Sequence, residues 1–167
     1  MGEDLRPRWE WYLMFDIEEL MFLKKLTGKK AGKNLFDEAN APIYGKYIAM
    51  QSQALTSGDW MQSDSGKTFS MEVKPNTDYA ISAFNESITI LRVLCMDVDP
   101  STLGPYESYH SENVKSFGTA RTGTIKTGAN EKWIVIQVNG TNVTARNAEI
   151  QVEYGTAKTE PYEPYQS

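Results

Sequence analysis

Residues 132–154, with the sequence KWIVIQVNGTNVTARNAEIQVEY, carry the pattern that decides the fold. Apolar side chains recur there at every second position in two short segments, and this spacing puts them on one face of a strand. They are Ile134, Ile136 and Val138 in the first segment, and Ile150, Val152 and Tyr154 in the second. We expect both sets in a core. Asn139-Gly140, between them, is typical of a tight turn.

Further strand and turn patterns occur in the residues that precede this stretch. Strands are predicted at residues 43–50, 67–73, 78–84, 88–97, 123–126, 132–138 and 148–154. Lys74-Pro75-Asn76-Thr77 has turn chemistry, because Pro presets φ and Asn tolerates the left-handed region. The segment 88–97 is apolar on both faces, which is typical of a central strand covered on both sides. Seven or eight strands with this spacing predict an all-β fold, a two-sheet antiparallel β-sandwich.

The N-terminal residues 1–33 differ from this pattern. Aromatic and apolar side chains alternate in residues 8–16, which favours a strand, and Asp16 has the features of an N-cap for a helix over 17–26. One amphipathic helix through the whole segment is an alternative. The predicted helix is apolar all round, so it must be covered by its own domain or by another chain. We therefore expect a strand-helix anchoring or oligomerisation segment at 1–33, followed by a domain at 34–167.

Composition and charge exclude several classes of protein. The chain has 167 residues and a net charge of -5, so it lacks the basic field that nucleic-acid binding needs. The single cysteine, Cys95, excludes an internal disulfide framework. No apolar run is long enough to span a bilayer, and Glu3-Asp4 stands where a signal peptide would be basic. We expect a protein made in the cytoplasm, with no nucleic acid or membrane as partner.

Four longer stretches resemble a known family. They are KNLFD at 33–37, VKPNTDYAIS at 73–82, EKWIVIQVN at 131–139 and AEIQVEYGTAKTEPYEPY at 148–165. Together they resemble the carbohydrate-binding-type jelly-roll modules of bacteriophage tail, baseplate and receptor-binding proteins. The resemblance implies a virion component that attaches to the host, with cell-wall or capsular saccharide and other virion proteins as partners. It also implies a homo-oligomer, with a trimer favoured. The alternative is a purely structural virion protein that uses the jelly roll as a docking or spacer domain.

A sugar site on a β-sandwich needs flat rings for the C–H faces of the sugar and polar groups at the rim. Trp60 lies in TSGDWMQSDSG beside carboxylates, and Tyr106, Tyr109 and His110 lie in a long polar segment with Glu107 and Glu112. We predict that these four residues bind carbohydrate. The alternative is that Trp60 and Tyr106 pack down and close the ends of the sandwich, and that His110 is a solvated side chain.

Catalytic and metal-binding motifs are not evident. With one His and one Cys, the chain lacks the parts of hydrolase triads, zincins and thiol enzymes, and we expect no enzyme. Residues 97–101 begin like a calcium loop but lack the later Gly and Glu of an EF-hand. We expect no cofactor and no metal-ligating motif, although a structural calcium ion held by backbone oxygens stays open.

Overall fold

The computed structural model describes residues 34–51, 57–63, 67–144, 146–158 and 161–166. The chain divides into two units, residues 1–31 and 32–167, and the described residues all belong to the second. The predicted N-terminal strand, helix and oligomerisation segment lie outside the described residues.

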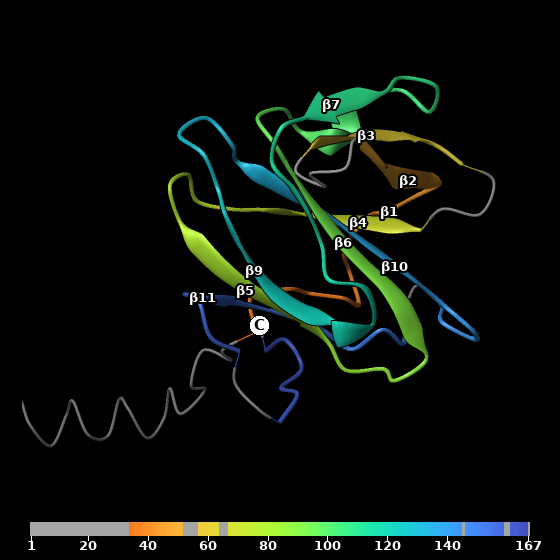
Figure 1. Cartoon of the computed structure of the whole chain (residues 1–167), viewed down its shortest axis with the longest axis vertical. Helices are drawn as coiled ribbons and strands as arrows, with labels where there is room; N and C mark the ends of the chain where they lie inside the picture. The colour runs from red at the N-terminus through yellow and green to blue at the C-terminus, as the bar shows by residue number, and fades with distance from the viewer. Residues whose placement is uncertain (1–33, 52–56, 64–66, 145, 159–160, 167) are drawn as a thin grey trace, which may run out of the picture. The chain divides into compact units, whose positions relative to one another are not determined.

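Short antiparallel strands make up the described chain (Figure 1). They are β1 (Ile43–Tyr44), β2 (Lys46–Gln51), β3 (Ser57–Gln62), β4 (Thr68–Glu72), β5 (Asp78–Ala83), β6 (Ile88–Met96), β7 (Tyr109–Ser111), β8 (Val114–Ser116), β9 (Thr122–Lys126), β10 (Trp133–Gly140) and β11 (Ile150–Tyr154). Two 3-10 helices, η1 (Pro100–Thr102) and η2 (Gly118–Ala120), lie between strands. The prediction of an all-β antiparallel sandwich is confirmed.

Three sheets form this sandwich. Their strand orders are β1-β4-β10-β6-β8, β11-β5-β9 and β2-β3-β7. One apolar core lies between the five-stranded sheet and β11-β5-β9, and a second lies between the other face of the five-stranded sheet and β2-β3-β7. The third sheet was not expected, because no strand was predicted at the residues of β3 and β7. Strand β6 contributes to both cores, which confirms that this strand is covered on both sides.

The expected inward faces hold with one exception. Ile134, Ile136 and Val138 are buried in the first core, and so are Ile150 and Val152. Tyr154 was expected in the core and is instead 52% exposed. It occupies the last position of β11, at the rim of the sandwich, where the first core ends. The ring is therefore half free.

One of the two predicted turns is found at the predicted residues, and the other is not. Pro75 and Asn76 form the turn between β4 and β5, with Asn76 at a φ of 53°. Asn139-Gly140 is not the turn, since both residues still belong to β10 and the chain reverses at Thr141–Asn142. Gly140 is required for another reason, because a Cβ there would collide with the carbonyl oxygen of Ser87.

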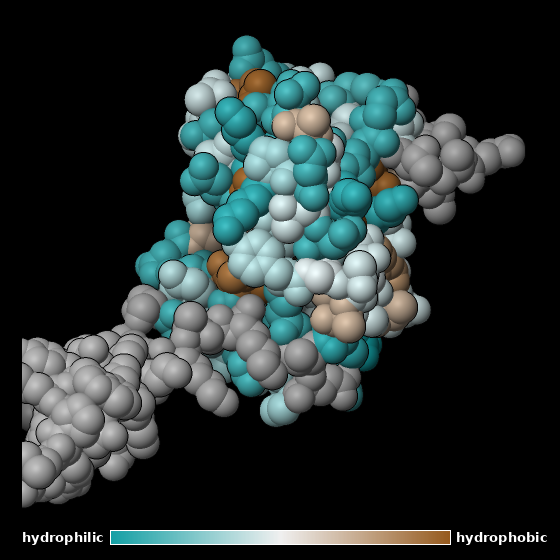
Figure 2. Space-filling view, turned by 90° about the vertical axis from the view of Figure 1, so that its left-hand side faces the viewer, coloured by the Kyte–Doolittle hydropathy of each residue, from teal (hydrophilic) through white to brown (hydrophobic). Residues whose placement is uncertain are grey.

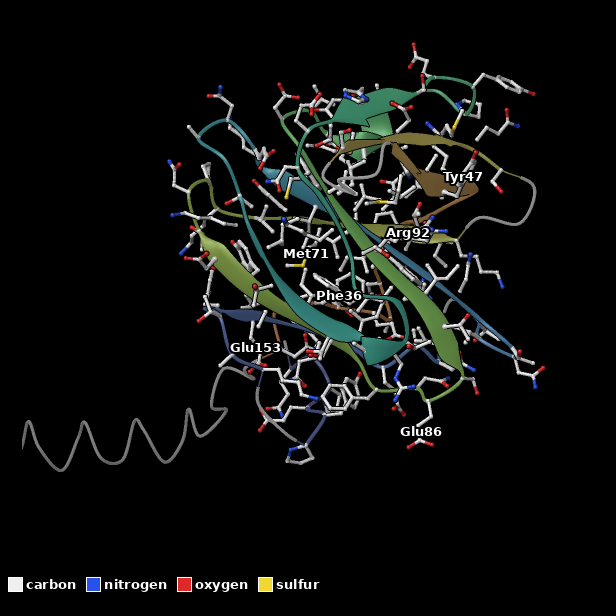
Figure 3. All side chains as sticks on the ribbon, in the orientation of Figure 1. Phe36, Tyr47, Met71, Glu86, Arg92 and Glu153 are labelled. Atoms are coloured by element: carbon white, nitrogen blue, oxygen red, sulfur yellow. The ribbon has the colours of Figure 1, made fainter. Side chains whose placement is uncertain are left out.

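The segment 34–41 closes the sandwich beside β11. The Asn34 side chain donates to the Ile150 carbonyl oxygen at 2.9 Å and accepts from the Val152 N–H at 2.9 Å. Phe36 is buried in the first core and points between the sheets, as does Met71 of β4 (Figure 3). This segment thus lies next to two strands, β4 and β11, and the cavities described below open along it.

Candidate functional site

Trp60, the first residue predicted to bind carbohydrate, is fully buried in the second core. Its indole N–H donates to the Thr68 hydroxyl at 3.0 Å, and the Tyr44 ring meets it edge-on at 5.0 Å between centroids. The Lys46 ammonium lies 4.2 Å from the ring centre. No ring face is free for a sugar, so the prediction for Trp60 does not hold and the packing alternative does.

Tyr106 is 83% exposed, on a loop that is firmly anchored. The ammonium of Lys46, itself buried, donates to the carbonyl oxygens of Gly104 and Glu107 at 2.8 Å each. Burial lowers the pKa of Lys46, and the nearby Glu107 opposes this effect. The Glu107 carboxylate also accepts from the Gly104 N–H at 2.7 Å. The loop therefore presents one free ring on a fixed backbone.

Tyr109 and His110 are neighbours on β7 and point to opposite faces of it. Tyr109 packs against the second core, and its hydroxyl donates to Asp97 at 2.6 Å. Burial and this hydrogen bond raise the pKa of Tyr109 to about 12. His110 is exposed and lies between the carboxylates of Glu112 and Asp59, at 2.9 Å and 2.7 Å. These hydrogen bonds raise the pKa of His110.

The four predicted residues thus do not form one surface. Trp60 and the Tyr109 ring belong to the second core, whereas His110 faces solvent. Tyr106 is free but lines none of the described cavities. The ring of Trp133, at the start of β10, is half-buried against the second core.

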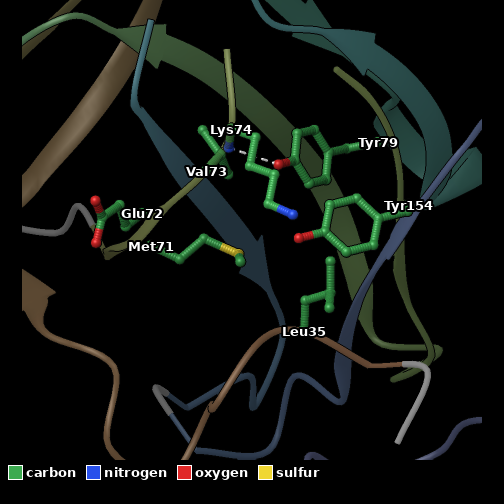
Figure 4. Close-up of a pocket in the computed structure, with 7 residues that line it drawn as sticks. All are labelled: Leu35, Met71, Glu72, Val73, Lys74, Tyr79 and Tyr154. Carbon is green, nitrogen blue, oxygen red and sulfur yellow. Dashed lines mark hydrogen bonds between the residues drawn. The ribbon is translucent and has the colours of Figure 1, made fainter. Parts of the chain in front are cut away.

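A cavity that was not predicted opens at the rim of the first core (Figure 4). Its volume is about 360 Å³, within the range of small-molecule sites. Its lining residues come from the segment 34–41, from β4 and the following turn, from β5 and from β11: Leu35, Met71, Glu72, Val73, Lys74, Tyr79 and Tyr154. We call this cavity the rim pocket.

Two tyrosine rings form one wall of the rim pocket. Tyr154 and Tyr79 are paired across β11 and β5, and their ring centroids are 5.5 Å apart with planes tilted by 37°. The Tyr79 hydroxyl accepts from the Lys74 backbone N–H at 2.7 Å, and burial raises the pKa of Tyr79. This contact holds the turn after β4 against the inner ring. The outer ring, Tyr154, is 52% exposed, and its hydroxyl group points into the pocket (Figure 4).

The rest of the pocket combines an apolar floor with polar groups at its mouth. Leu35 and Met71 are both half-buried and pack against the first core. The Lys74 ammonium lies 5.1 Å from the centre of the Tyr154 ring, and among the described residues it has no hydrogen-bond acceptor. Glu72 lies on the side of the pocket away from Tyr154 (Figure 4). The pocket can therefore take a ligand with one flat apolar face and polar groups around its edge.

Sequence reasoning missed this site because Tyr154 fits the inward alternation of its strand. The available signal was the position of Tyr154 directly before Gly155, which has a φ of 101° and ends the strand. A large ring at the last position of an edge strand has core on one side only. The pocket also needs Lys74 and Leu35, which are far apart in sequence.

Comparisons with known proteins assign no function to the chain, and neither do its possible metal ligands or its helices. No protein-family model, no curated protein and no solved structure matches the chain significantly. Within the described ranges, no three His, Cys, Asp or Glu side chains are grouped so that they could hold a metal ion. The described part of the chain contains no helix of the length and apolarity needed to cross a membrane.

Proposed function

We propose that residues 34–167 form a non-catalytic saccharide-binding module of a phage tail or baseplate, which attaches the virion to host cell-wall or capsular saccharide. The observation that carries the proposal is the half-exposed Tyr154 ring, held at the wall of the rim pocket by Tyr79 and with Lys74 above it. The phage setting rests on the family resemblance alone. Several copies in a homo-oligomer, with a trimer favoured, would add avidity to weak single sites.

The chemistry of the rim pocket suits a sugar. The C–H face of a pyranose is apolar and covers an aromatic ring, while its hydroxyl groups need donors and acceptors around the edge. Tyr154 supplies the ring, the Lys74 ammonium supplies three donors and Glu72 supplies acceptor oxygens. These groups surround the apolar floor of Leu35 and Met71.

The same pocket supports binding without catalysis. Glycoside hydrolysis uses two carboxyl groups on opposite sides of the scissile bond. Among the described residues that line the rim pocket, Glu72 is the only carboxylate. We therefore propose no reaction at this site.

The second candidate, a structural virion protein, predicts a large apolar docking surface. The large hydrophobic side chains that are exposed in the described part of the chain are Ile43, Tyr106, Tyr154 and Tyr165. Three of these four carry a hydroxyl group. On the face seen in Figure 2, hydrophobic residues form small separate spots among hydrophilic ones. These observations favour saccharide binding over docking for the described surface.

Replacing Tyr154 by Ala tests the proposal, with Tyr106→Ala as the matched control. A ring that covers one sugar face removes apolar area worth roughly 1–2 kcal/mol, so Tyr154→Ala should weaken binding to host-wall fragments roughly 5- to 30-fold. Tyr106→Ala removes a ring that is more exposed than Tyr154, on the loop of residues 103–107, and should leave binding unchanged. Thermal unfolding of both variants checks that the fold is kept.

The opposite outcomes have defined meanings. If Tyr106→Ala abolishes binding and Tyr154→Ala does not, the site is the loop of residues 103–107 and the rim pocket is refuted. If the unaltered chain binds no wall or capsular saccharide, the adhesion proposal fails and the structural alternative stands.

A further inference from the structure

The rim pocket adjoins two further cavities. A second cavity of about 260 Å³ shares Leu35, Met71 and Glu72 with the rim pocket. A third cavity of about 480 Å³ shares Asp37 and Tyr165 with the second. The three cavities therefore lie next to one another along the segment 34–41. We call this row of cavities the rim groove.

Aromatic rings occur along the whole rim groove. Tyr154 stands in the first cavity, Tyr165 at the boundary of the second and third, and Tyr162 in the third. Tyr165 is 41% exposed, somewhat less than Tyr154 at 52%. Tyr162 packs on Phe84 at 5.5 Å between ring centroids. Rings repeated at intervals along a groove are suited to a ligand made of repeated flat units.

The C-terminal residues that carry these rings are held in place by the body of the domain. The Glu163 N–H donates to the Gln151 side-chain oxygen at 2.8 Å, which ties residues 161–166 to β11. The Tyr162 ring packs against Phe84, whereas the Tyr165 ring is accessible and lines the groove.

The charges of the rim groove indicate which saccharide it can take. Its lining contains four carboxylates, Asp37, Glu38, Glu72 and Glu149, and two cations, Lys74 and Arg146. A groove with this excess of negative charge disfavours a polyanionic chain.

One of the two cations is already committed. The Arg146 guanidinium donates to the backbone carbonyl oxygens of Glu38 and Ala41, at 3.2 Å for Ala41. The side-chain carboxylates of Glu72 and Glu149 have no hydrogen bond or ion pair to another described residue, and their oxygens are acceptors only. Apart from Lys74, the unpaired polar groups of the groove are therefore acceptors, which can bind donors such as sugar hydroxyl groups.

We propose that the rim groove binds an extended, uncharged saccharide chain, with one sugar over Tyr154 and further sugars running past Tyr165 to Tyr162. This inference rests on the proposed function and names its ligand class. A single terminal sugar would fill only the rim pocket, and a phosphodiester or uronate chain would meet uncompensated carboxylates in the middle of the groove.

The test measures binding of the full chain to a glycan array. The array carries neutral glucose and N-acetylglucosamine oligosaccharides of increasing length, from the monosaccharide upward, together with poly(glycerol phosphate) and polygalacturonate. Affinity for the neutral series should rise with length by about tenfold or more before it levels off. Tyr165→Ala should remove this rise and leave monosaccharide binding unchanged, while Tyr165→Phe, which keeps the ring, should retain it.

Each other outcome overturns the inference in a recognisable way. Equal affinity for all lengths, still lost in Tyr154→Ala, would keep the proposed function and limit the site to the rim pocket. Preferential binding of the polyanions, weakened by salt, would refute the uncharged ligand. Failure to bind any saccharide on the array would overturn the proposed function and this inference together.

Discussion

Removing the Glu38 carboxylate should destabilise the domain strongly, because this side chain connects the segment 34–41 to the start of β11. Glu38 is buried, and its two oxygens accept from the backbone N–H groups of Ala148 and Ile150 at 2.9 Å and 2.8 Å. Between these two donors stands Glu149, at a φ of 54°. Because Glu149 has this left-handed conformation, both N–H groups point toward the same carboxylate. Among the described residues, no neighbouring strand offers them another acceptor.

The magnitude follows from the two donors. A buried N–H group left without an acceptor costs about 1–3 kcal/mol, so with two such groups Glu38→Ala should cost roughly 2–6 kcal/mol. This is a large part of a typical unfolding free energy of about 5–15 kcal/mol. The melting temperature should fall by roughly 10 °C. Glu38→Gln keeps one acceptor oxygen and places an amide NH₂ against the other N–H, so it should retain about half of the stabilisation.

The assay is urea and thermal unfolding of the full chain, with Glu86→Ala as control. Glu86 is exposed, and it is its backbone carbonyl oxygen that accepts a hydrogen bond from Arg121, so replacing its side chain should change stability by no more than about 0.5 kcal/mol. A loss below about 1 kcal/mol in Glu38→Ala would mean that the Ala148 and Ile150 N–H groups find other acceptors, and would refute the reasoning.

Two further predictions concern residues that were first expected to bind sugar. Trp60→Ala should lower the free energy of unfolding by about 3–5 kcal/mol because it leaves a cavity in the second core. Trp60→Phe should lower it by less, while leaving the Thr68 hydroxyl without its donor. An unchanged melting temperature in both variants would contradict the burial of Trp60. The pKa of His110 is raised above its ordinary value of 6.5 by hydrogen bonds to Glu112 and Asp59, so its stabilising effect is fully present below pH 6.5 and is lost as the pH rises through the folded-state pKa. Unfolding at about pH 5 and about pH 8 should show this loss in the unaltered chain and not in His110→Gln, and an identical difference in both would contradict it.

The local parts of the fold could be predicted because strand alternation has a period of two residues. Ile134, Ile136 and Val138 reach the same core by this rule, and Pro75-Asn76 makes its turn through its own φ preferences. The third sheet could not be predicted in the same way. Strand β3 has the sequence SGDWMQ, which has turn-like residues, and only pairing with β2 and β7 makes it a strand.

The candidate site, too, could be predicted only in part. Rings and carboxylates mark possible sugar contacts in any sequence, but their exposure depends on what packs over them. Trp60 is covered by the five-stranded sheet, and Tyr154, which fits a core pattern, stands free at the rim. Exposure is a property of the assembled layers, so the alternation of side chains alone does not distinguish these two residues.

By itself, the sequence determined the all-β antiparallel character of residues 34–167, most of the strands of the first core and one of its turns. These features depend on neighbours within a few residues along the chain, through side-chain alternation and φ preference. The tertiary structure alone decided the third sheet, the burial of Trp60 and the rim groove. These depend on groups far apart in sequence, such as Leu35, Lys74 and Tyr154, which meet only when the edges of β4 and β11 close around the segment 34–41.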